Sequence, residues 1–329
     1  MRRRVWRHGT VSAVGFGAMS FGGFYGPTNE AESMRTMARA LELGVDFWDT
    51  ANVYGDGLCE RLIGRFLAED KSRRGKVTLA TKFAIRRNDK GARFFDNSAS
   101  HIREALDGSL KRLGVDHIDL YYVHRVDPSI PIEDTVGELA RLVEAGAIGA
   151  IGLSEVAPDT LRRAHAAHPI AAVQSEYSLW TRGPELGLIQ ACAEISAILV
   201  AFSPLGRGAL TGLLQNVETF GEKDFRRVNP RFQGINWRRN RDRLDAFVAL
   251  ARSWGLRPAT LAIAWTLARA PHVVPIPGTR AAGHLDECAA ADKIDLTEAE
   301  LAAIERALPV GFAAGERYSE SQWVGIQKY

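Results

Sequence analysis

The chain has 329 residues, of which 46% are hydrophobic and 25% are charged, and its formal net charge is +3. These values are ordinary for a globular protein, and a chain of this length buries a large core without disulfide staples. Three widely spaced cysteines give no disulfide framework, and no apolar run reaches the length of a membrane span, so a cytoplasmic protein is predicted.

Strands and helices are predicted to alternate along almost the whole chain. Residues 4–12, with a turn at Gly9-Thr10, predict a short hairpin, and residues 13–19 predict a first buried strand. Further strands are predicted at residues 45–49, 77–81, 118–123, 148–153, 172–175, 198–202 and 272–276. Helices are predicted at residues 29–43, 59–68, 98–113, 132–144, 158–167, 184–194, 258–269 and 297–308. Such alternation is typical of βαβ units around a parallel sheet, and residues 1–329 are expected to form a single domain.

Residues 206–236 interrupt this alternation, because they have weak hydrophobic periodicity and many Gly, Asn and Arg residues. Long segments of this kind are usually functional or disordered, so we interpret this one as a flap near a ligand. Arginines are dense from Arg226 to Arg243 and again from Arg2 to Arg7. A solvated basic face, which in the flap could help hold phosphates, is favoured over nucleic-acid binding.

Four polar residues follow the predicted strands at the point where each strand ends. Asp49 closes one strand, and Tyr54 lies five residues further along the loop. Lys82 and His124 stand at the ends of the next two strands. In parallel α/β folds the chemistry is built at this end of the strands, so we expect the four side chains to share one mouth.

Each of these residues also has a structural interpretation. Asp49 could cap a turn, Tyr54 could pack at a rim, Lys82 could be a surface charge and His124 a satisfied core histidine. The occurrence of all four in matching contexts favours a catalytic site, because the carboxyl ends of several parallel strands converge at one place.

Two other patterns carry less weight. Gly15-x-Gly17 begins like a dinucleotide-binding loop, but the third glycine of that fingerprint is replaced by Ser20, so close packing in a strand is preferred. His165 and His168 have a spacing that metal ligands can use, but no cysteine or carboxylate pair completes the set, and no metal site is predicted.

Seven phrases together resemble the aldo-keto reductases: FWDTANVYG, ATKF, YYVHR, GLSE, VQSEY, AFSPLGRG and PIPGT. They occur in that family's order and cover roughly residues 11–308. The resemblance implies a (β/α)8 TIM barrel whose N-terminal hairpin plugs the floor and whose seventh strand is followed by a long loop. It also implies bound NADP(H), with Asp49, Tyr54, Lys82 and His124 as the catalytic tetrad.

The resemblance further implies which residues hold the cofactor. Ser154 and Gln174 would bind the carboxamide, and Phe202 would stack on the nicotinamide ring. The remaining cofactor-binding positions are Gly17, Met19, Ser203, Pro204, Leu205, Gly206, Arg207, Ile276, Gly278, Thr279, Arg280, Glu287 and Cys288. Of these, residues 203–207 would follow the pyrophosphate, and residues 278–280 would bind the 2′-phosphate with Glu287 nearby.

The sequence departs from the family pattern at two of these places. Glu155 stands after Ser154 where many relatives have Asn, and an acid there could still accept from the carboxamide NH2 group. Cys288 stands where many relatives have an Asn that pairs with the adenine edge, so weaker adenine binding is expected.

Carbonyl reduction requires a hydride and a proton, and only the proton can come from a side chain. Tyr54 can donate it, and we expect Lys82 to lower the tyrosine pKa from its usual value of about 10 while Asp49 holds the lysine. His124 would orient the carbonyl oxygen. The predicted function is NADPH-dependent reduction of small aldehydes or ketones to alcohols, with no nucleic-acid or membrane partner. The alternative is a cofactor-binding regulatory subunit resembling channel β-subunits, against which the complete tetrad argues.

Overall fold

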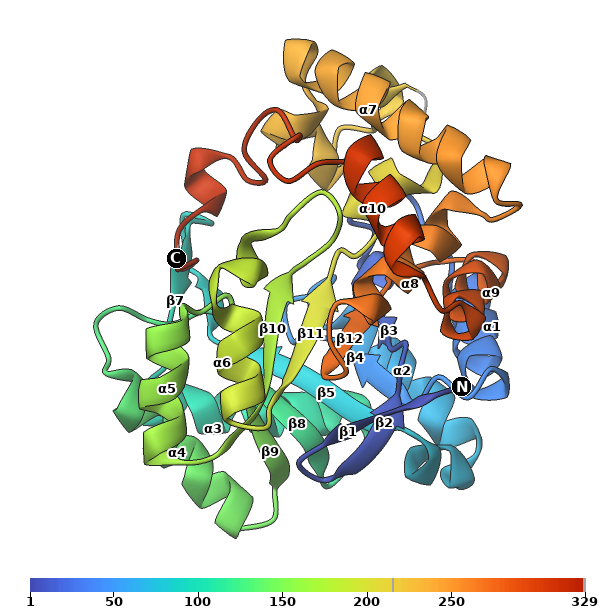
Figure 1. Ribbon diagram of the computed structural model, residues 1–329. Coiled ribbons are helices and arrows are strands. Elements are labelled where there is room, and N and C mark those ends of the chain that lie inside the picture. The colour runs from blue at the N-terminus through green and yellow to red at the C-terminus, as the bar shows by residue number, and fades with distance from the viewer. Residues whose placement is uncertain (215, 328–329) are drawn as a thin grey trace.

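Eight parallel strands form a barrel, and helices surround it (Figure 1). The structure is a computed structural model that describes residues 1–214 and 216–327. The two edge strands of the sheet meet through a parallel bridge between Gly17 and Gly278. The amide of Gly15 also donates to the carbonyl of Pro275 at 2.9 Å, so the sheet closes on itself. The predicted TIM barrel is confirmed.

The barrel strands, in chain order and in sheet order, are β3 (Phe16–Gly17), β4 (Phe47–Asp49), β5 (Thr78–Phe83), β8 (Ile118–Val123), β9 (Ile148–Ser154), β10 (Ile170–Glu176), β11 (Ile198–Phe202) and β12 (Val273–Ile276). The helices of the described chain are α1 (Glu30–Glu42), α2 (Leu58–Glu69), α3 (Ala99–Leu113), α4 (Ile132–Glu144), α5 (Pro158–Ala167), α6 (Leu188–Glu194), α7 (Gly234–Ser253), α8 (Pro258–Ala268), α9 (Ala282–Ala290) and α10 (Glu298–Ala307). Two antiparallel hairpins stand outside the barrel, β1 (Arg3–Trp6) with β2 (Gly9–Ser12), and β6 (Ile85–Arg87) with β7 (Arg93–Phe95).

Sequence periodicity located most of these elements and missed three. The first strand is shorter than predicted, and the helix predicted at 184–194 divides at Gly187, whose φ of 118° no helix accommodates. Helices α7 and α9 and the β6–β7 hairpin were not predicted. Helix α7 has several arginines in its first half, and α9 is rich in alanine, so in both the apolar stripe is weak.

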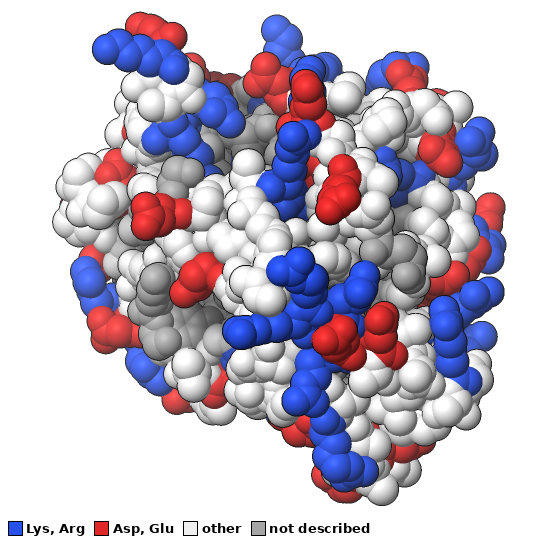
Figure 2. Space-filling model, turned by 90° about the horizontal axis from the view of Figure 1, so that it is seen from above, with Lys and Arg blue, Asp and Glu red and all other residues white. Residues whose placement is uncertain are grey.

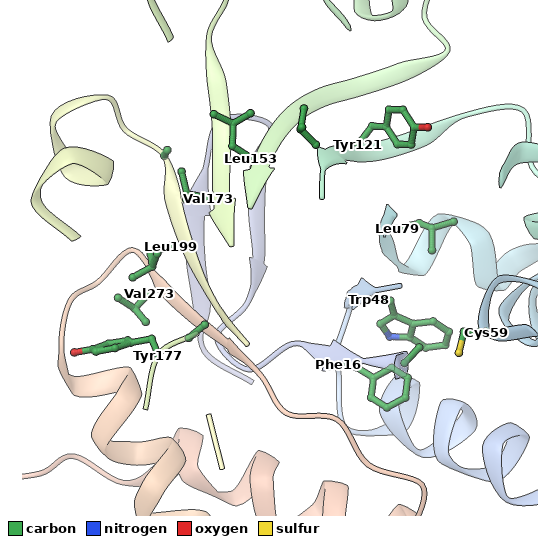
Figure 3. Packing of buried hydrophobic residues seen from close by; sticks show 14 of the residues in the cluster. Phe16, Trp48, Cys59, Leu79, Tyr121, Leu153, Val173, Tyr177, Leu199 and Val273 are labelled. Carbon is green, nitrogen blue, oxygen red and sulfur yellow. The ribbon is translucent and has the colours of Figure 1, made fainter. Parts of the chain in front are cut away.

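Alternation along the strands divides the core into two layers. Phe47, Ala80 and Leu120 belong to a cluster inside the barrel, whereas their chain neighbours Trp48 and Leu79 belong to the cluster between the barrel and its helices. Figure 3 shows members of this outer layer, which come from several strands around the barrel. Successive strand residues point to opposite faces, so one set of strands fills both layers.

The β1–β2 hairpin closes the barrel at one end. Trp6 and Val11 are buried in the same cluster as the inward-facing residues of the strands, so they form the floor that was expected. In Figure 1 this hairpin lies at the lower end, and the segment between β11 and α7 lies at the upper end. The open mouth is therefore at the carboxyl ends of the strands.

The same alternation carries polar side chains into that mouth. Each of three polar residues lies two positions after an inward-facing core residue: Asp49 after Phe47, Lys82 after Ala80 and His124 after Tyr122. The packing register of the core thus fixes which strand-end side chains face the centre.

Charged side chains of both signs are interspersed over the face seen in Figure 2. Many of the surface arginines are ion-paired, as Arg162 is with Glu194. Within the described residues, no helix combines the length and apolarity that a membrane span requires.

The contact of α2 with α3 gives a stability prediction. A Cβ added to the buried Gly64 would lie 2.5 Å from the backbone oxygen of Arg112, which cannot move aside easily. We expect Gly64→Ala to lower the free energy of unfolding by about 1–3 kcal/mol. Gly137, on the exposed side of α4, has no atom within 4 Å of such a Cβ, so Gly137→Ala should instead stabilise by about 0.5–1 kcal/mol. Urea denaturation of both variants is the test, and equal effects would contradict the assigned packing.

Candidate active site

A buried ion pair lies at the centre of the barrel mouth. Lys82 Nζ donates to Asp49 Oδ1 at 2.5 Å and to the carbonyl of Thr50 at 2.7 Å. Gln174 Nε2 donates to the second carboxylate oxygen of Asp49 at 2.7 Å. The side chain of Lys82 is 0% exposed and that of Asp49 is 4% exposed. Burial raises the Asp49 pKa and lowers the Lys82 pKa, whereas their mutual attraction opposes both changes.

Tyr54 lies beside this pair. The loop after β4 turns back at Ala51, whose carbonyl accepts from the Tyr54 amide at 3.1 Å. Lys82 Nζ stands 3.5 Å from the Tyr54 hydroxyl and 5.0 Å from the centroid of its ring. Sequence reasoning expected Lys82 to lower the tyrosine pKa. Burial, together with the charge of Asp49, raises that pKa well above its usual value, and the charge of Arg125 opposes this rise only in part. Tyr54 is therefore a protonated phenol over the whole neutral range.

His124 completes the group. Its ring lies nearly perpendicular to that of Tyr54, with 5.7 Å between the centroids. Burial lowers its pKa well below the usual value, and the charges of Arg125, Lys82 and Arg93 act in the same direction. The imidazole is therefore neutral, and its Nδ1 atom is buried without a hydrogen-bond partner in the described part of the chain. A neutral imidazole can hydrogen-bond a ligand without taking part as an acid.

The residues expected at the carboxamide already have protein partners. Ser154 Oγ accepts from Arg125 at 3.1 Å, and the amide of Gln174 is bound to Asp49. Glu155 is directed elsewhere, because its carboxylate accepts from Ser175 and from the amide of Glu176. The backbone of Glu155 has a φ of 58°, a left-handed conformation that turns the chain at the end of β9.

The segment after β11 contains non-glycine residues with positive φ angles, a backbone strain that is common in functional loops. Ser203 and Arg207 have φ angles of 50° and 58°, and Gly206 and Gly208 also lie in the left-handed region. Phe202 is the inward-facing last residue of β11 and is half-buried. The flanking Pro204 and Leu205 lead into a short 3-10 turn.

The opposite side of the mouth is formed by the ends of β3 and β12. Gly278 lies against Gly17, where an added Cβ on Gly278 would be 3.3 Å from the Gly17 carbonyl. Thr279 Oγ1 accepts from the amide of Ala281 just before α9. Arg280 donates to the carbonyl of Pro27 and has no carboxylate partner among residues 1–214 and 216–327.

The other four expected cofactor positions differ in accessibility. Ile276 is buried at the end of β12, and Met19 is half-buried in the turn after β3. Glu287 is half-buried 3.9 Å from Arg257. Cys288 is 1% exposed and packs in a core cluster, and burial raises its thiol pKa to about 12.

Sequence reasoning missed a second charged cluster at the same end of the barrel. Arg317, from the segment after α10, contacts Glu155 at 2.5 Å and Glu176 at 3.2 Å. Glu176 also binds Arg207 at 2.8 Å. The inward register two residues beyond Gln174 could have indicated Glu176, but no local pattern indicates Arg317. The cluster ties the C-terminal segment to the strand ends. No set of three His, Cys, Asp or Glu residues able to hold a metal ion occurs in the described parts of the chain.

This cluster gives a pH prediction. Burial alone would raise the Glu176 pKa, but Arg207, Arg317 and Arg231 outweigh it and lower that pKa from 4.5 to about 2. Because the Glu176 pKa is lower in the folded than in the unfolded protein, ionised Glu176 stabilises the fold above pH 4.5, and this stabilisation is lost as the pH falls toward 2. Ionised Glu176 contributes about 3 kcal/mol to the free energy of unfolding. We expect Glu176→Gln to be less stable at pH 7 and to lose less stability between pH 5 and 3 than the wild type.

Urea denaturation at a series of pH values measures this difference. Glu133→Gln, which removes the exposed ion pair with Arg163, is the matched control and should follow the wild-type curve closely. A Glu176→Gln profile parallel to that of the wild type would contradict the assignment.

Comparison with known proteins agrees with the geometry. Residues 13–309 match the model of the Aldo/keto reductase family. The chain is 42% identical over 313 residues to "Aldo-keto reductase yakc [NADP(+)]" of Schizosaccharomyces pombe, covering 94% of this chain and 92% of that one. It is 43% identical over 311 residues to "Probable aldo-keto reductase 1" of Glycine max, covering 94% and 88%.

A solved structure shows the same likeness in three dimensions. The glycerol dehydrogenase AKR11B4 from Gluconobacter oxydans superposes with a TM-score of 0.84 and 30% sequence identity, covering 93% of this chain and 94% of that one. The barrel with its strand-end polar residues, the family model and these relatives agree, and the chain belongs to the aldo/keto reductase family of oxidoreductases.

Proposed function

We propose that the protein reduces aldehydes or ketones to alcohols with NADPH and that Tyr54 is the proton donor. The observation that carries this proposal is the contact of Asp49, Lys82 and Tyr54 in one buried group beside His124. A protonated phenol, a fixed cation and a neutral imidazole around one small volume match the needs of carbonyl reduction.

Each residue has a distinct part in the proposed mechanism. Bound NADPH would supply the hydride to the carbonyl carbon. Tyr54 holds a proton at its hydroxyl oxygen and releases it to the carbonyl oxygen, leaving a phenolate. Lys82 Nζ, 3.5 Å away, stabilises that negative charge as it forms, and Asp49 with Gln174 keeps the ammonium group in place. His124 donates a hydrogen bond that orients the carbonyl.

The proton balance follows from the raised tyrosine pKa. A phenol with a high pKa stays protonated at neutral pH, but it gives up its proton reluctantly. The proton therefore leaves only as negative charge develops on the carbonyl oxygen, and the phenolate that remains is stabilised by the neighbouring ammonium group.

The residues around α9 fit an anionic cofactor group. The first amide groups of a helix have no partner within the helix and carry a partial positive charge. Arg280 adds a guanidinium without a carboxylate partner in the described chain, and Gly278 leaves space for close approach. These groups would hold the 2′-phosphate of NADP, a ligand that the name of the fission-yeast relative includes.

Replacing Tyr54 with Phe tests the proton donor. The ring remains but the proton is lost, so kcat should fall by a factor of roughly 10² or more. The chain has seven tryptophans, whose fluorescence quenching reports NADPH binding, and that binding should be unchanged. Near-normal turnover of Tyr54→Phe with a slowly reduced aldehyde would show that another group is the acid.

Replacing Arg280 with Ala tests cofactor selection. A hydrogen bond to a charged group contributes about 1.5–3 kcal/mol, so NADPH affinity should fall about ten- to a hundred-fold while NADH affinity stays nearly constant. The control is Arg39→Ala, since Arg39 lies near α9 but is ion-paired with Asp286. Fluorescence titration with both cofactors measures the effect. If both weaken equally in Arg280→Ala, the 2′-phosphate is bound elsewhere, most simply by the arginines around Arg226.

A further inference from the structure

Arg125, directly after His124, is a buried cation that forms no ion pair with any carboxylate of residues 1–214 and 216–327. Arg125 is only 6% exposed. Its Nη1 donates to the carbonyl of His124 at 2.6 Å and to Ser154 Oγ at 3.1 Å. Its Nε atom is buried without a hydrogen-bond partner in the described residues, and no carboxylate of those residues lies within ion-pair distance. Asn97 fixes the loop, because its amide donates to the carbonyl of Arg125 at 3.2 Å.

Arg93, on the β6–β7 hairpin, is near enough to Arg125 and His124 for its charge to lower the His124 pKa. It is half-buried over the ring of Phe95, and its Nη2 donates to the carbonyl of Val324 at 3.3 Å. Its Nε atom also lacks a partner in the described chain. Burial, followed by the charge of Arg125, lowers the Arg93 pKa to about 10, as expected for two cations in one poorly solvated place.

The surrounding charges do not balance these two arginines. Asp49 is already bound to Lys82, and Glu155 and Glu176 are already bound to Arg317 and Arg207. On the same hairpin, Arg86 is paired with Asp96 at 2.8 Å. The excess positive charge is therefore specific to the neighbourhood of His124, whose pKa Arg125 and Arg93 both lower.

A buried guanidinium without a partner is costly, and guanidinium groups bind carboxylates and phosphates through paired donors. The proposed cofactor does not supply that partner, because its carboxamide is neutral, its pyrophosphate would follow residues 203–207 and its 2′-phosphate would lie near α9. The oxyanion that balances the two charges must then come from the substrate.

We infer that the substrate is a carbonyl compound that also carries an oxyanion group, which Arg125 and Arg93 hold while the carbonyl lies between Tyr54 and His124. This rests on the proposed function. The phenyl group of Phe24 lies beside the proposed carbonyl position, because it packs on Tyr54 with 5.9 Å between ring centroids. The substrate class is therefore aldehydes or ketones with a carboxylate or phosphate a few bonds from the carbonyl.

A matched pair of aldehydes tests the inference. The wild type should have a kcat/KM for 4-carboxybenzaldehyde at least about ten-fold above that for its neutral methyl ester, mostly through KM, and salt should shrink this ratio. Glyceraldehyde 3-phosphate against glyceraldehyde shows whether a phosphate serves in place of a carboxylate. A wild-type ratio near one in both pairs would overturn the inference.

Variants on one hairpin locate the site. Arg93→Gln should lower the ratio of kcat/KM for 4-carboxybenzaldehyde to that for its methyl ester about ten-fold. Arg86→Gln, which breaks an ordinary surface ion pair, should leave this ratio unchanged. Arg125→Lys keeps the charge but loses the paired donors, so this variant should also have a lower ratio. An Arg93→Gln ratio equal to that of the wild type would overturn the assignment of Arg93.

Binding without turnover separates this inference from the proposed function. Benzoate should quench the tryptophan fluorescence of the wild type and of Arg86→Gln, and bind at least about ten-fold more weakly to Arg93→Gln. If neither aldehyde is reduced but benzoate binds in this pattern, the oxyanion site stands and the proposed reductase activity fails. If the aldehydes are reduced but benzoate binds all three proteins equally, the reductase activity stands and the oxyanion site fails.

Discussion

The structure of the mouth depends on the buried contact between Lys82 and Asp49. Two opposite charges leave water at this point, and the loss of hydration is offset only because each has further partners. Thr50 supplies a carbonyl to the ammonium group, and Gln174 supplies an amide to the carboxylate. These contacts join β4, β5 and β10 across the barrel. Removing one member of such a pair typically costs about 3–5 kcal/mol. The pair holds the Lys82 ammonium group 3.5 Å from the Tyr54 hydroxyl.

Burial, more than charge, determines how Tyr54 and His124 titrate. Tyr54 and His124 are both pushed toward their neutral forms, the tyrosine by a raised pKa and the histidine by a lowered one. A neutral donor and a neutral imidazole can both hydrogen-bond a carbonyl oxygen. The ionised groups nearby are then free to stabilise charge that appears during a reaction, in a medium that screens it weakly.

The charges at this end of the barrel fall into three groups with different functions. Lys82 and Asp49 balance each other. Glu155 and Glu176 are balanced by Arg317 and Arg207, and this second group holds the C-terminal segment over the strand ends. Arg125 and Arg93 are balanced by nothing in the described chain. Because an unpaired buried cation is costly, the third group is the part of the mouth whose structure is completed by a ligand.

The sequence by itself predicted the parallel βαβ units from periodicity, and the barrel from the resemblance of its motifs; it also located Asp49, Lys82 and His124 at strand ends with Tyr54 in the loop after the first of them. Period-two and period-3.6 patterns are local, and the alternation that buries Phe47 and Ala80 also points Asp49 and Lys82 into the mouth. Helix α7 escaped because its apolar stripe is weak. Only the tertiary structure decided that Gln174 binds Asp49, that Arg317 reaches Glu155 from 162 residues away, and that the Tyr54 pKa rises. Those features depend on burial and on contacts between distant segments, and no local pattern of residues encodes either.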